Sequence, residues 1–539
     1  MKRDLSRLRR DSFDVLVIGG GIHGAAAARA AAARGLATAL IEQGDFGHAT
    51  SANSLKILHG GLRYLQHGDL AKVRDSVRAR RAMLQRFAHL SAPLPCVLPT
   101  RGLGLRSRPA MAAALLINDL LSADRNLGIE SACRLPRGRT VTRAELTRRA
   151  PHLADGRATG GALWYDGIAL DTERLVLELV IDAAAGGAAV ANRVRAVGFL
   201  RRGSRVEGVR ARDERDGAEF DIRAGVTITA AGPWLGELHR PLAGDQARTP
   251  LAKAINIVVG RPVFGDTAVG VEGIGTKRLF FFVPWRGGTM IGTSYLPHEG
   301  PPDACAVTPL EIEQMVGEIN RIHPAARITP EEVRFAHAGL LPLDPKRGPL
   351  PAVEAGLLKR PRLIDAAREY GIEGLVGVVG IKYTTGMTVG ARAVDLAADK
   401  LGRSGVRHAM DLRRQPAPSA PPGLDAVLAE RLARTYGAAT GPIFADLAAN
   451  GSLARRIARE QPTTAAEVRH AVRDEMALSL ADIVLRRTPL GTFGHPGRSV
   501  LETCAAIAGD ALAWDAARRA REIDLVETEY RRLGAREAL

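Results

Sequence analysis

A glycine-rich turn near the first residue constrains the fold of this chain more than any other sequence feature. Residues 13–18 are rich in apolar residues, as in a buried strand, and an alanine-rich stretch that follows residue 24 is typical of a helix. Between them stand Gly19, Gly21 and Gly24, at the spacing that allows a tight turn, close approach of a pyrophosphate and close packing of helix on strand. This arrangement predicts a βα unit whose helix N-terminus binds phosphate groups.

A second strand and an acidic residue extend this unit to a dinucleotide-binding pattern. Residues 36–41 predict another buried strand, and Glu42 follows it directly. A carboxylate at this place can accept hydrogen bonds from ribose hydroxyls. Gly19, Gly21, Gly24 and Glu42 are therefore candidate cofactor-binding residues, although the pattern alone does not separate FAD from NAD.

The length and the segment pattern predict more than one domain. A chain of 539 residues exceeds the size at which one hydrophobic core keeps growing. Strand-like and helix-like segments alternate over residues 10–413, and the proline-rich residues 414–423 predict a stiff linker. Residues 424–539 have helical patterns, which we place at 424–436, 443–449, 465–487 and 500–532. The expected fold class is an α/β region followed by an all-α C-terminal domain.

Composition narrows the environment and the partners. No apolar run approaches the roughly 18 residues of a membrane-spanning helix, and no export signal is visible, so we expect a cytoplasmic protein. The four cysteines lie far apart, so neither a disulfide framework nor a metal site is expected. The net charge of +17 favours binding of anionic ligands, RNA or lipid head groups. Alternatively, the many arginines that produce this charge reflect the base composition of the genome. Aromatic residues make up only 4% of the chain, which argues against nucleic-acid binding by base stacking.

Several further segments resemble one family of flavoenzymes. Residues 50–65 (TSANSLKILHGGLRYL) are similar to the stretch that lies along the flavin in FAD-dependent glycerol-3-phosphate dehydrogenases. Residues 230–234 (AAGPW), 278–285, 382–385 (KYTT) and 467–488 resemble other segments of that family, in the same order. The resemblance implies a Rossmann-type FAD-binding domain, interleaved with an antiparallel-sheet substrate domain and followed by a helical C-terminal domain.

The resemblance also implies which residues bind FAD and which act on a substrate. Besides the glycine turn and Glu42, it places at the cofactor Thr50, Ser51, Ser54, Lys56, His59, Gly61, Gly232, Lys382 and Thr384. It implies that Lys382 compensates charge near the flavin, that Arg63 and Tyr64 contact substrate, and that His59 accepts a proton. A purely structural role stays open for His59 and for Arg63, and His337 is a weaker candidate for the base.

The reaction that the resemblance implies is oxidation of sn-glycerol 3-phosphate to dihydroxyacetone phosphate, with electrons passed to quinone or another acceptor. It also implies peripheral attachment to the inner face of the cell membrane, for which the arginine-rich residues 72–86 are a candidate, and it leaves a homodimer open.

Three positions depart from the family pattern on the substrate side. Leu341 stands where the family has an arginine, Asn256 where it has a histidine, and Tyr295 where it has an aspartate. Either another arginine, Arg334 or Arg347, supplies the missing charge, or the substrate differs. A flavin-dependent dehydrogenase or oxidase of another small hydroxy acid or amine is therefore the first alternative. A tRNA-docking or non-catalytic flavoprotein is the second.

Overall fold

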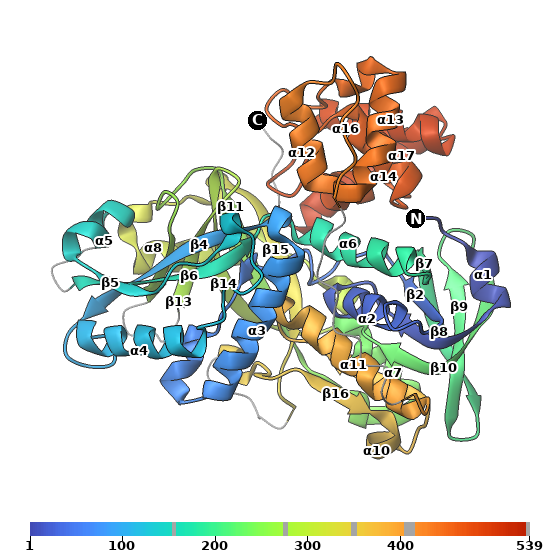
Figure 1. Ribbon diagram of the computed structural model, residues 1–539, viewed down its shortest axis with the longest axis horizontal. Coiled ribbons are helices and arrows are strands. Elements are labelled where there is room, and N and C mark those ends of the chain that lie inside the picture. Colours follow the sequence, from blue (N-terminus) through green and yellow to red (C-terminus); the bar gives the residue numbers. More distant parts are fainter. Residues whose placement is uncertain (154–157, 273–278, 346–352, 404–415, 535–539) are drawn as a thin grey trace.

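Two sheets organise the chain in the computed structural model, which describes residues 1–153, 158–272, 279–345, 353–403 and 416–534 (Figure 1). In the first sheet, as far as the described residues show, five strands run parallel in the order β17-β10-β1-β2-β7. Strand β16 pairs antiparallel with β17. Strands β8 and β9 form a hairpin, and β9 pairs antiparallel with β10. Its strands are β1 (Ser12–Ile18), β2 (Thr38–Glu42), β7 (Ala189–Asn192), β8 (Val194–Arg202), β9 (Arg205–Asp213), β10 (Glu219–Thr229), β16 (Arg362–Asp365) and β17 (Leu375–Val379).

The first sheet is covered on both faces, which explains why its parallel strands are almost uniformly apolar. Val15 and Val17 face the helices α2 (Ile22–Ala32), α6 (Thr172–Ala185) and α11 (Gly386–Lys400), where alanine-rich α2 packs between the other two. Leu16 and Ile18 face the opposite side, which β8, β9 and α1 (Leu5–Arg10) cover. The expected β1–glycine turn–α2–β2 unit is therefore present.

The second sheet is mostly antiparallel and has the order β15-β11-β14-β13-β12-β4-β6-β3, with β5 beside β6. Only the β12–β4 pair is parallel among the pairs within the described residues. Its strands are β3 (Ile57–Leu58), β4 (Ser91–Arg101), β5 (Arg139–Val141), β6 (Ala158–Ala169), β11 (Leu251–Val259), β12 (Ala268–Glu272), β13 (Leu279–Trp285), β14 (Gly288–His298) and β15 (Val333–Pro342). Because its strands alternate along the chain with those of the first sheet, the two sheets are interleaved, as the resemblance implied.

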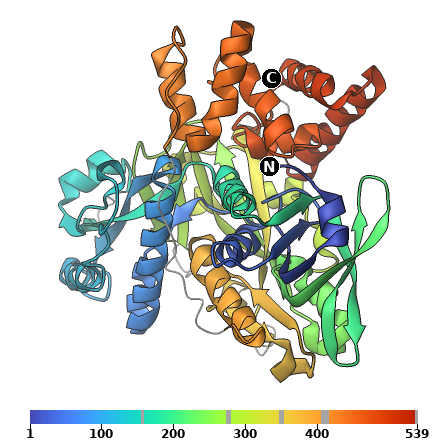
Figure 2. The ribbon, with the colours of Figure 1, turned by 45° about the vertical axis from the view of Figure 1, so that its right-hand side comes forward.

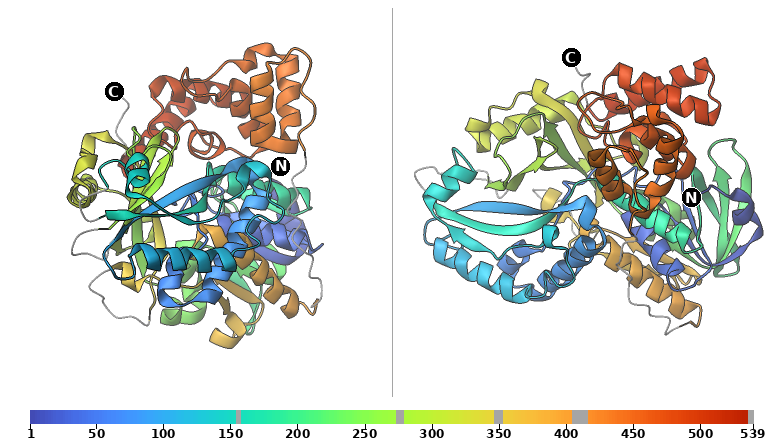
Figure 3. Two further views of the ribbon diagram at one scale, coloured as in Figure 1. Left: turned by 60° about the vertical axis from the view of Figure 1, so that its left-hand side comes forward. Right: turned by 45° about the horizontal axis from the view of Figure 1, so that its top comes forward.

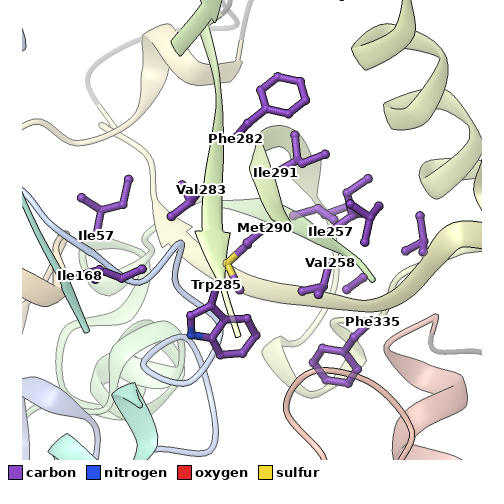
Figure 4. Packing of buried hydrophobic residues seen from close by; sticks show 14 of the residues in the cluster. Ile57, Ile168, Ile257, Val258, Phe282, Val283, Trp285, Met290, Ile291 and Phe335 are labelled. Atoms are coloured by element: carbon purple, nitrogen blue, oxygen red, sulfur yellow. The ribbon is translucent and has the colours of Figure 1, made fainter. Parts of the chain in front are cut away.

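Further helices connect the two sheets, and each packs against one or the other. They are α3 (Leu70–Arg86), α4 (Arg108–Leu121), α5 (Arg143–Arg149), α7 (Leu235–Ala243), α8 (Pro309–Ile322), α9 (Val353–Gly356) and α10 (Ala366–Tyr370). Figure 4 shows one part of the core, in which Phe282, Val283 and Trp285 of β13 pack beside Met290 and Ile291 of β14. The same cluster includes residues from the C-terminal helices, so the helical region shares a core with the substrate sheet.

The C-terminal helices lie together on one side of both sheets, coloured orange to red in Figures 1, 2 and 3. They are α12 (Ala426–Tyr436), α13 (Thr440–Ala449), α14 (Ala465–Asp474), α15 (Leu480–Asp482), α16 (Arg498–Leu512) and α17 (Ala516–Arg532). The N-terminus meets them, since the amino group of Met1 donates to the carbonyl oxygen of Asp474 over 2.7 Å. The predicted linker at 414–423 begins within residues 404–415, which lie outside the described part of the chain.

Two of the predicted C-terminal helices are each broken in the structure. The segment 465–487 ends its first helix at Asp474, because Met476 has a φ of 56° and Ser479 starts a new capping box. The segment 500–532 is interrupted at Ala513, which has a φ of 55°, and Asp515 caps α17 by accepting from the amide of Arg518. Periodic apolar residues continue through both breaks, so hydrophobic spacing alone predicted single helices.

The described residues contain neither a helix that could span a membrane nor a cluster of metal ligands. None of their helices combines the length and apolar character needed to cross a bilayer. They also contain no group of three or more histidine, cysteine, aspartate or glutamate side chains arranged to hold a metal ion.

Candidate active site

A large cavity runs between the two sheets and collects most of the predicted site residues. Its volume is about 2510 Å³, well above the roughly 300–1,000 Å³ of a pocket for one small molecule. The walls come from the ends of β1, β2 and β17 on one side and from β11, β14 and β15 on the other. The space is thus large enough for a dinucleotide and a substrate together.

The glycine turn has the close backbone contacts that its sequence predicted. Gly19 has a φ of 106°, and a Cβ atom there would lie 2.5 Å from the carbonyl oxygen of Ala230. A Cβ atom on Gly24 would lie 1.8 Å from the carbonyl oxygen of Gly19. Gly21 caps α2, and the hydroxyl of Ser51 accepts a hydrogen bond from the Ile22 amide at 3.0 Å. The N-terminus of α2 therefore faces the cavity. The backbone contacts at Gly19 and Gly24 are too close for any residue with a Cβ atom.

Glu42 lines the same end of the cavity and braces two loops. Its Oε2 accepts a hydrogen bond of 2.6 Å from the amide of Gly20, and its Oε1 accepts one of 2.7 Å from the amide of Gly44. The rings of His48 and Trp234 lie nearby with centroids 5.9 Å apart and also line the cavity. Gly232, with a φ of 54°, belongs to the same wall. A carboxylate and two flat rings suit an adenosine moiety at this end.

The segment 50–61 runs along the cavity, but its polar side chains differ in what they face. Thr50 joins the two sheets, since its Oγ1 donates to the carbonyl oxygen of Leu340 at 3.0 Å and accepts from the Leu340 amide at 3.1 Å. Ser54 lines the cavity and accepts from the Lys56 amide at 3.3 Å. Gly61 also lines it, with a φ of 84°. The segment thus forms a continuous wall in which Thr50 acts mainly as a brace.

Lys56 lines the cavity, but its ammonium group points to α6. Its ammonium group is fully buried and donates to Glu173 Oε1 at 2.9 Å, Thr172 Oγ1 at 2.6 Å and the carbonyl oxygen of Ala52 at 2.6 Å. Three acceptors satisfy all three of its N–H groups. The ammonium group of Lys56 thus ties the cavity wall to α6, and because Lys56 also lines the cavity, its contact with the cofactor stays a prediction.

Lys382, by contrast, points its charge at the cavity. It follows β17, and its ammonium donates to the hydroxyl of Tyr64. Burial lowers the pKa of Lys382 to about 8. Thr384, two residues on, accepts a hydrogen bond of 3.2 Å from the His59 amide. Four of the predicted residues, from segments more than 300 positions apart in the chain, thus meet at one place.

A buried carboxylate that sequence reasoning missed supports this group. Asp166 of β6 accepts 2.6 Å and 2.5 Å hydrogen bonds from the Gly60 amide and from Arg80, and its Oδ2 lies 3.9 Å from His59 Nδ1. Burial alone would raise the pKa of Asp166, but the neighbouring His59 and the Arg80 charge lower it to about 2. Its signal in the sequence is an aspartate inside the apolar strand around Trp164 and Tyr165.

The remaining predicted substrate residues divide into those that reach the cavity and those that do not. Arg63, Asn256, Tyr295 and Leu341 line it, and the Asn256 Oδ1 accepts a 2.8 Å hydrogen bond from Thr293. His337 does not line the cavity: it is buried against Trp285 and Phe335, and burial lowers its pKa well below the usual value. Arg334 lies over Phe493 outside the cavity, and Arg347 lies outside the described residues. His337 and Arg334 are therefore excluded from direct roles.

These features fit a bound FAD. The close glycine turn, the anchored carboxylate and a cavity that extends past Lys382 provide separate places for the phosphates, the adenosine and the flavin ring. Gly19, Gly21, Glu42, Ser51 and Gly232 would hold the first two, whereas His59, Gly61, Lys382 and Thr384 would surround the ring. Gly24 does not line the cavity; it lies against the backbone of the turn, where it lets α2 approach closely. When bound, the flavin supplies hydride acceptance and electron transfer.

Comparison with protein families and relatives agrees with this fit. Residues 14–399 match the family described as FAD dependent oxidoreductase, and residues 387–519 match the C-terminal domain of alpha-glycerophosphate oxidase. A glycerol-3-phosphate dehydrogenase of Synechocystis sp. is 32% identical over 515 residues, which cover 90% of each chain. One from Mycobacterium leprae is 31% identical over 535 residues, covering 96% of this chain and 88% of the relative.

Solved structures show the same architecture. The FAD complex of a glycerol-3-phosphate dehydrogenase from Bacillus halodurans has a TM-score of 0.72 and 21% identity, with 98% of this chain and 96% of that chain covered. The FAD-bound L-alpha-glycerophosphate oxidase of Mycoplasma pneumoniae has a TM-score of 0.52 and 13% identity over 72% of this chain and 95% of that one. The chain therefore belongs to the FAD-dependent oxidoreductases, within the glycerol-3-phosphate dehydrogenase family.

Proposed function

We propose that this enzyme oxidises sn-glycerol 3-phosphate to dihydroxyacetone phosphate and passes the electrons to quinone or another acceptor. The observation that carries the proposal is the meeting of Lys382, Tyr64 and His59 in the cavity between the cofactor sheet and the substrate sheet. The similarity to glycerol-3-phosphate dehydrogenases over nearly the whole chain supports the choice of substrate.

Each of these side chains has a chemical task in the proposed reaction. The alcohol loses a hydride from carbon and a proton from oxygen, so the protein must take up the proton while it holds the carbon toward the cofactor. His59, half-exposed in the cavity and 3.9 Å from Asp166, can accept that proton, because the carboxylate stabilises the imidazolium. Lys382 provides positive charge, and the Tyr64 hydroxyl that it contacts can orient the alcohol.

Anaerobic reduction of the bound flavin tests this proposal directly. We expect sn-glycerol 3-phosphate to bleach the yellow absorbance of the holoenzyme, while glycolate and glycine leave it unchanged. The His59→Gln variant, with its FAD content checked, should bleach about a hundredfold more slowly. Bleaching by a hydroxy acid or an amine, with glycerol 3-phosphate inert, would favour the alternative substrate classes instead.

We further propose that the enzyme attaches to a lipid surface through α4 and the loop that precedes it. The predicted membrane helix at residues 72–86 is not suited to this role, because Arg80 and Arg86 of α3 are buried in ion pairs with Asp166 and Asp182. The α4 region instead exposes a group of large aliphatic side chains: Leu103, Leu105, Leu116, Ile117, Leu120 and Leu127.

The aliphatic side chains and the positive charge of this surface favour contact with an anionic lipid membrane. Exposed aliphatic groups on α4 and on the loops that flank it mark an interaction surface, and exposed Arg108 at the start of α4 adds positive charge. Leu105 and Ile117 also line the large cavity, so the surface continues into the active site. An apolar electron acceptor dissolved in the bilayer could therefore approach the flavin from this side.

Co-sedimentation with vesicles tests the attachment. We expect the wild type to bind vesicles that contain anionic lipid, and the Leu103→Ser/Leu120→Ser variant to lose about tenfold or more in affinity. Val427→Ser removes an equally exposed aliphatic group from distant α12 and should bind as the wild type does. Self-association of the wild type that the double substitution abolishes, without vesicle binding, would assign the surface to a homodimer.

A further inference from the structure

Two lysines that the sequence analysis did not name as site residues, Lys72 and Lys359, line the cavity. Lys72, in the first turn of α3, places its Nζ 4.0 Å from the centroid of the Tyr64 ring. Lys359 follows α9 and lines the same cavity. A hydrogen bond of 3.0 Å from the Leu358 amide to the carbonyl oxygen of Pro342 holds this segment against the end of β15, next to Leu341.

The charges around these lysines are not balanced by the protein. Within the described residues, no carboxylate lies within ion-pair distance of either ammonium, and the nearest acid, Asp69, is paired with Arg360 at 2.7 Å. Leu341 adds no charge to this wall. Burial, together with the charges of Arg360 and Lys359, lowers the pKa of Lys72, against the opposing effect of Asp69. The two ammonium groups therefore repel each other unless an anion joins them.

We propose that Lys72 and Lys359 together bind the phosphate group of the substrate. The proposal rests on the proposed function, because it assigns the anionic end of that same substrate. A phosphate dianion has several acceptor oxygens and enough charge to pair with both lysines, whereas a single carboxylate would neutralise only one.

The placement also suits the chemistry at the other end of the substrate. Tyr64 contacts Lys382 through its hydroxyl and Lys72 through its ring, so one side chain links the reacting group to the phosphate site. A short molecule with an alcohol at one end and a phosphate at the other can therefore place its alcohol near Lys382 and its phosphate near Lys72 and Lys359. Lys72 and Lys359 also provide positive charge in a cavity where residue 341 is a leucine.

The test compares Lys72→Gln and Lys359→Gln with Arg78→Gln. Arg78 is exposed on the same helix and does not line the cavity, so its variant removes one positive charge without touching the site. For each holoenzyme we would measure kcat and KM for sn-glycerol 3-phosphate and for uncharged glycerol with a dye as acceptor. Inorganic phosphate would be titrated separately, with the flavin absorbance as the signal, and FAD content and Tm would confirm that each variant is folded.

Each lysine variant should raise KM for sn-glycerol 3-phosphate about tenfold or more and weaken phosphate binding by a similar factor, with kcat little changed. Activity toward glycerol should stay at the wild-type level, and Arg78→Gln should match the wild type throughout. Unchanged phosphate binding in both lysine variants, or an equal loss of activity toward both substrates, would overturn the proposal. If the wild type does not oxidise glycerol 3-phosphate, the proposed function fails, but the phosphate titration still decides whether these lysines form an anion site.

Discussion

Gly24 and Lys382 are single residues on which the active site depends for different reasons. Gly24 lets α2 lie against the turn that follows β1. Any side chain at this position would clash, since the Cβ position is 1.8 Å from the carbonyl oxygen of Gly19. Lys382 contributes a charge whose protonation is sensitive to its buried surroundings. The first effect depends on the missing Cβ atom of Gly24 and the second on the ammonium group of Lys382, so single substitutions test them.

The Gly24→Ala substitution should damage cofactor binding and stability together. The added methyl group meets rigid backbone, so α2 must move away from the strand, and we expect a loss of about 3 kcal/mol in unfolding free energy. FAD content per chain and Tm measure both effects. Gly317→Ala is the matched control, because Gly317 is exposed in α8 with open space around its Cβ position, and it should gain about 1 kcal/mol. Normal FAD content in Gly24→Ala would show that the turn has room for a methyl group at this position.

The pH dependence of kcat/KM should follow the protonation of Lys382. Its pKa is lowered to about 8, so the ammonium is charged below that pH and becomes neutral above it. We therefore expect kcat/KM to fall as pH rises through about 8, and Lys382→Met to be about a hundredfold slower at pH 7. Lys382→Arg keeps its charge, so its alkaline limb should move upward. An alkaline limb in the same place for Lys382→Arg would assign the titration to another group.

At the scale of elements, ion pairs that bridge distant segments position the cavity walls. Lys56, just before β3, pairs with Glu173 in the first turn of α6, and this pair is fully buried. Lys56 and Lys382 both stand in segments that resemble the family, so the sequence offered no reason to separate them. Their surroundings in the structure differ, since the Lys56 ammonium is paired with Glu173 and the Lys382 ammonium contacts Tyr64.

The Lys56→Met substitution should lower stability more than it lowers the rate of flavin reduction. It leaves the Glu173 carboxylate buried without its partner, which costs about 3–5 kcal/mol. Adding Glu173→Met should restore much of that loss, because no unpaired charge then remains. Denaturant unfolding of the two variants measures the difference. Loss of FAD from Lys56→Met with unchanged stability would instead return Lys56 to the cofactor site.

At the scale of the whole molecule, the C-terminal helices hold the loop that follows β2. Arg487 donates two hydrogen bonds to buried Asp45, at 2.7 and 2.8 Å, and Arg486 adds a third at 2.7 Å. Burial alone would raise the pKa of Asp45, but the two arginine charges hold it well below the usual range. Because Asp45 lies three residues after Glu42, the helical region stabilises the end of the cavity that Glu42 lines.

Replacing Arg487 with methionine should loosen this connection. The substitution removes the two-point contact with Asp45, and we expect about 3–5 kcal/mol less stability at neutral pH. The loss should shrink as the pH falls through the lowered pKa of Asp45, because the carboxyl is then neutral and needs no partner. Thermal unfolding at several pH values measures this. Arg498→Gln breaks an exposed pair with Glu502 in the same helical region and should change stability by less than about 0.5 kcal/mol. An equal effect of the two substitutions would contradict the buried role of Arg487.

Sequence alone determined those features that arise within one short segment. The β1–turn–α2 unit follows from residues adjacent in the chain, whose conformations depend on local sterics and hydrogen bonds. Tertiary structure decided the direction of each charged side chain. It buried Lys56 with Glu173, excluded His337, paired His59 with Asp166 and brought Lys72 to Lys359, because burial and electrostatic partners come from segments that meet only after folding.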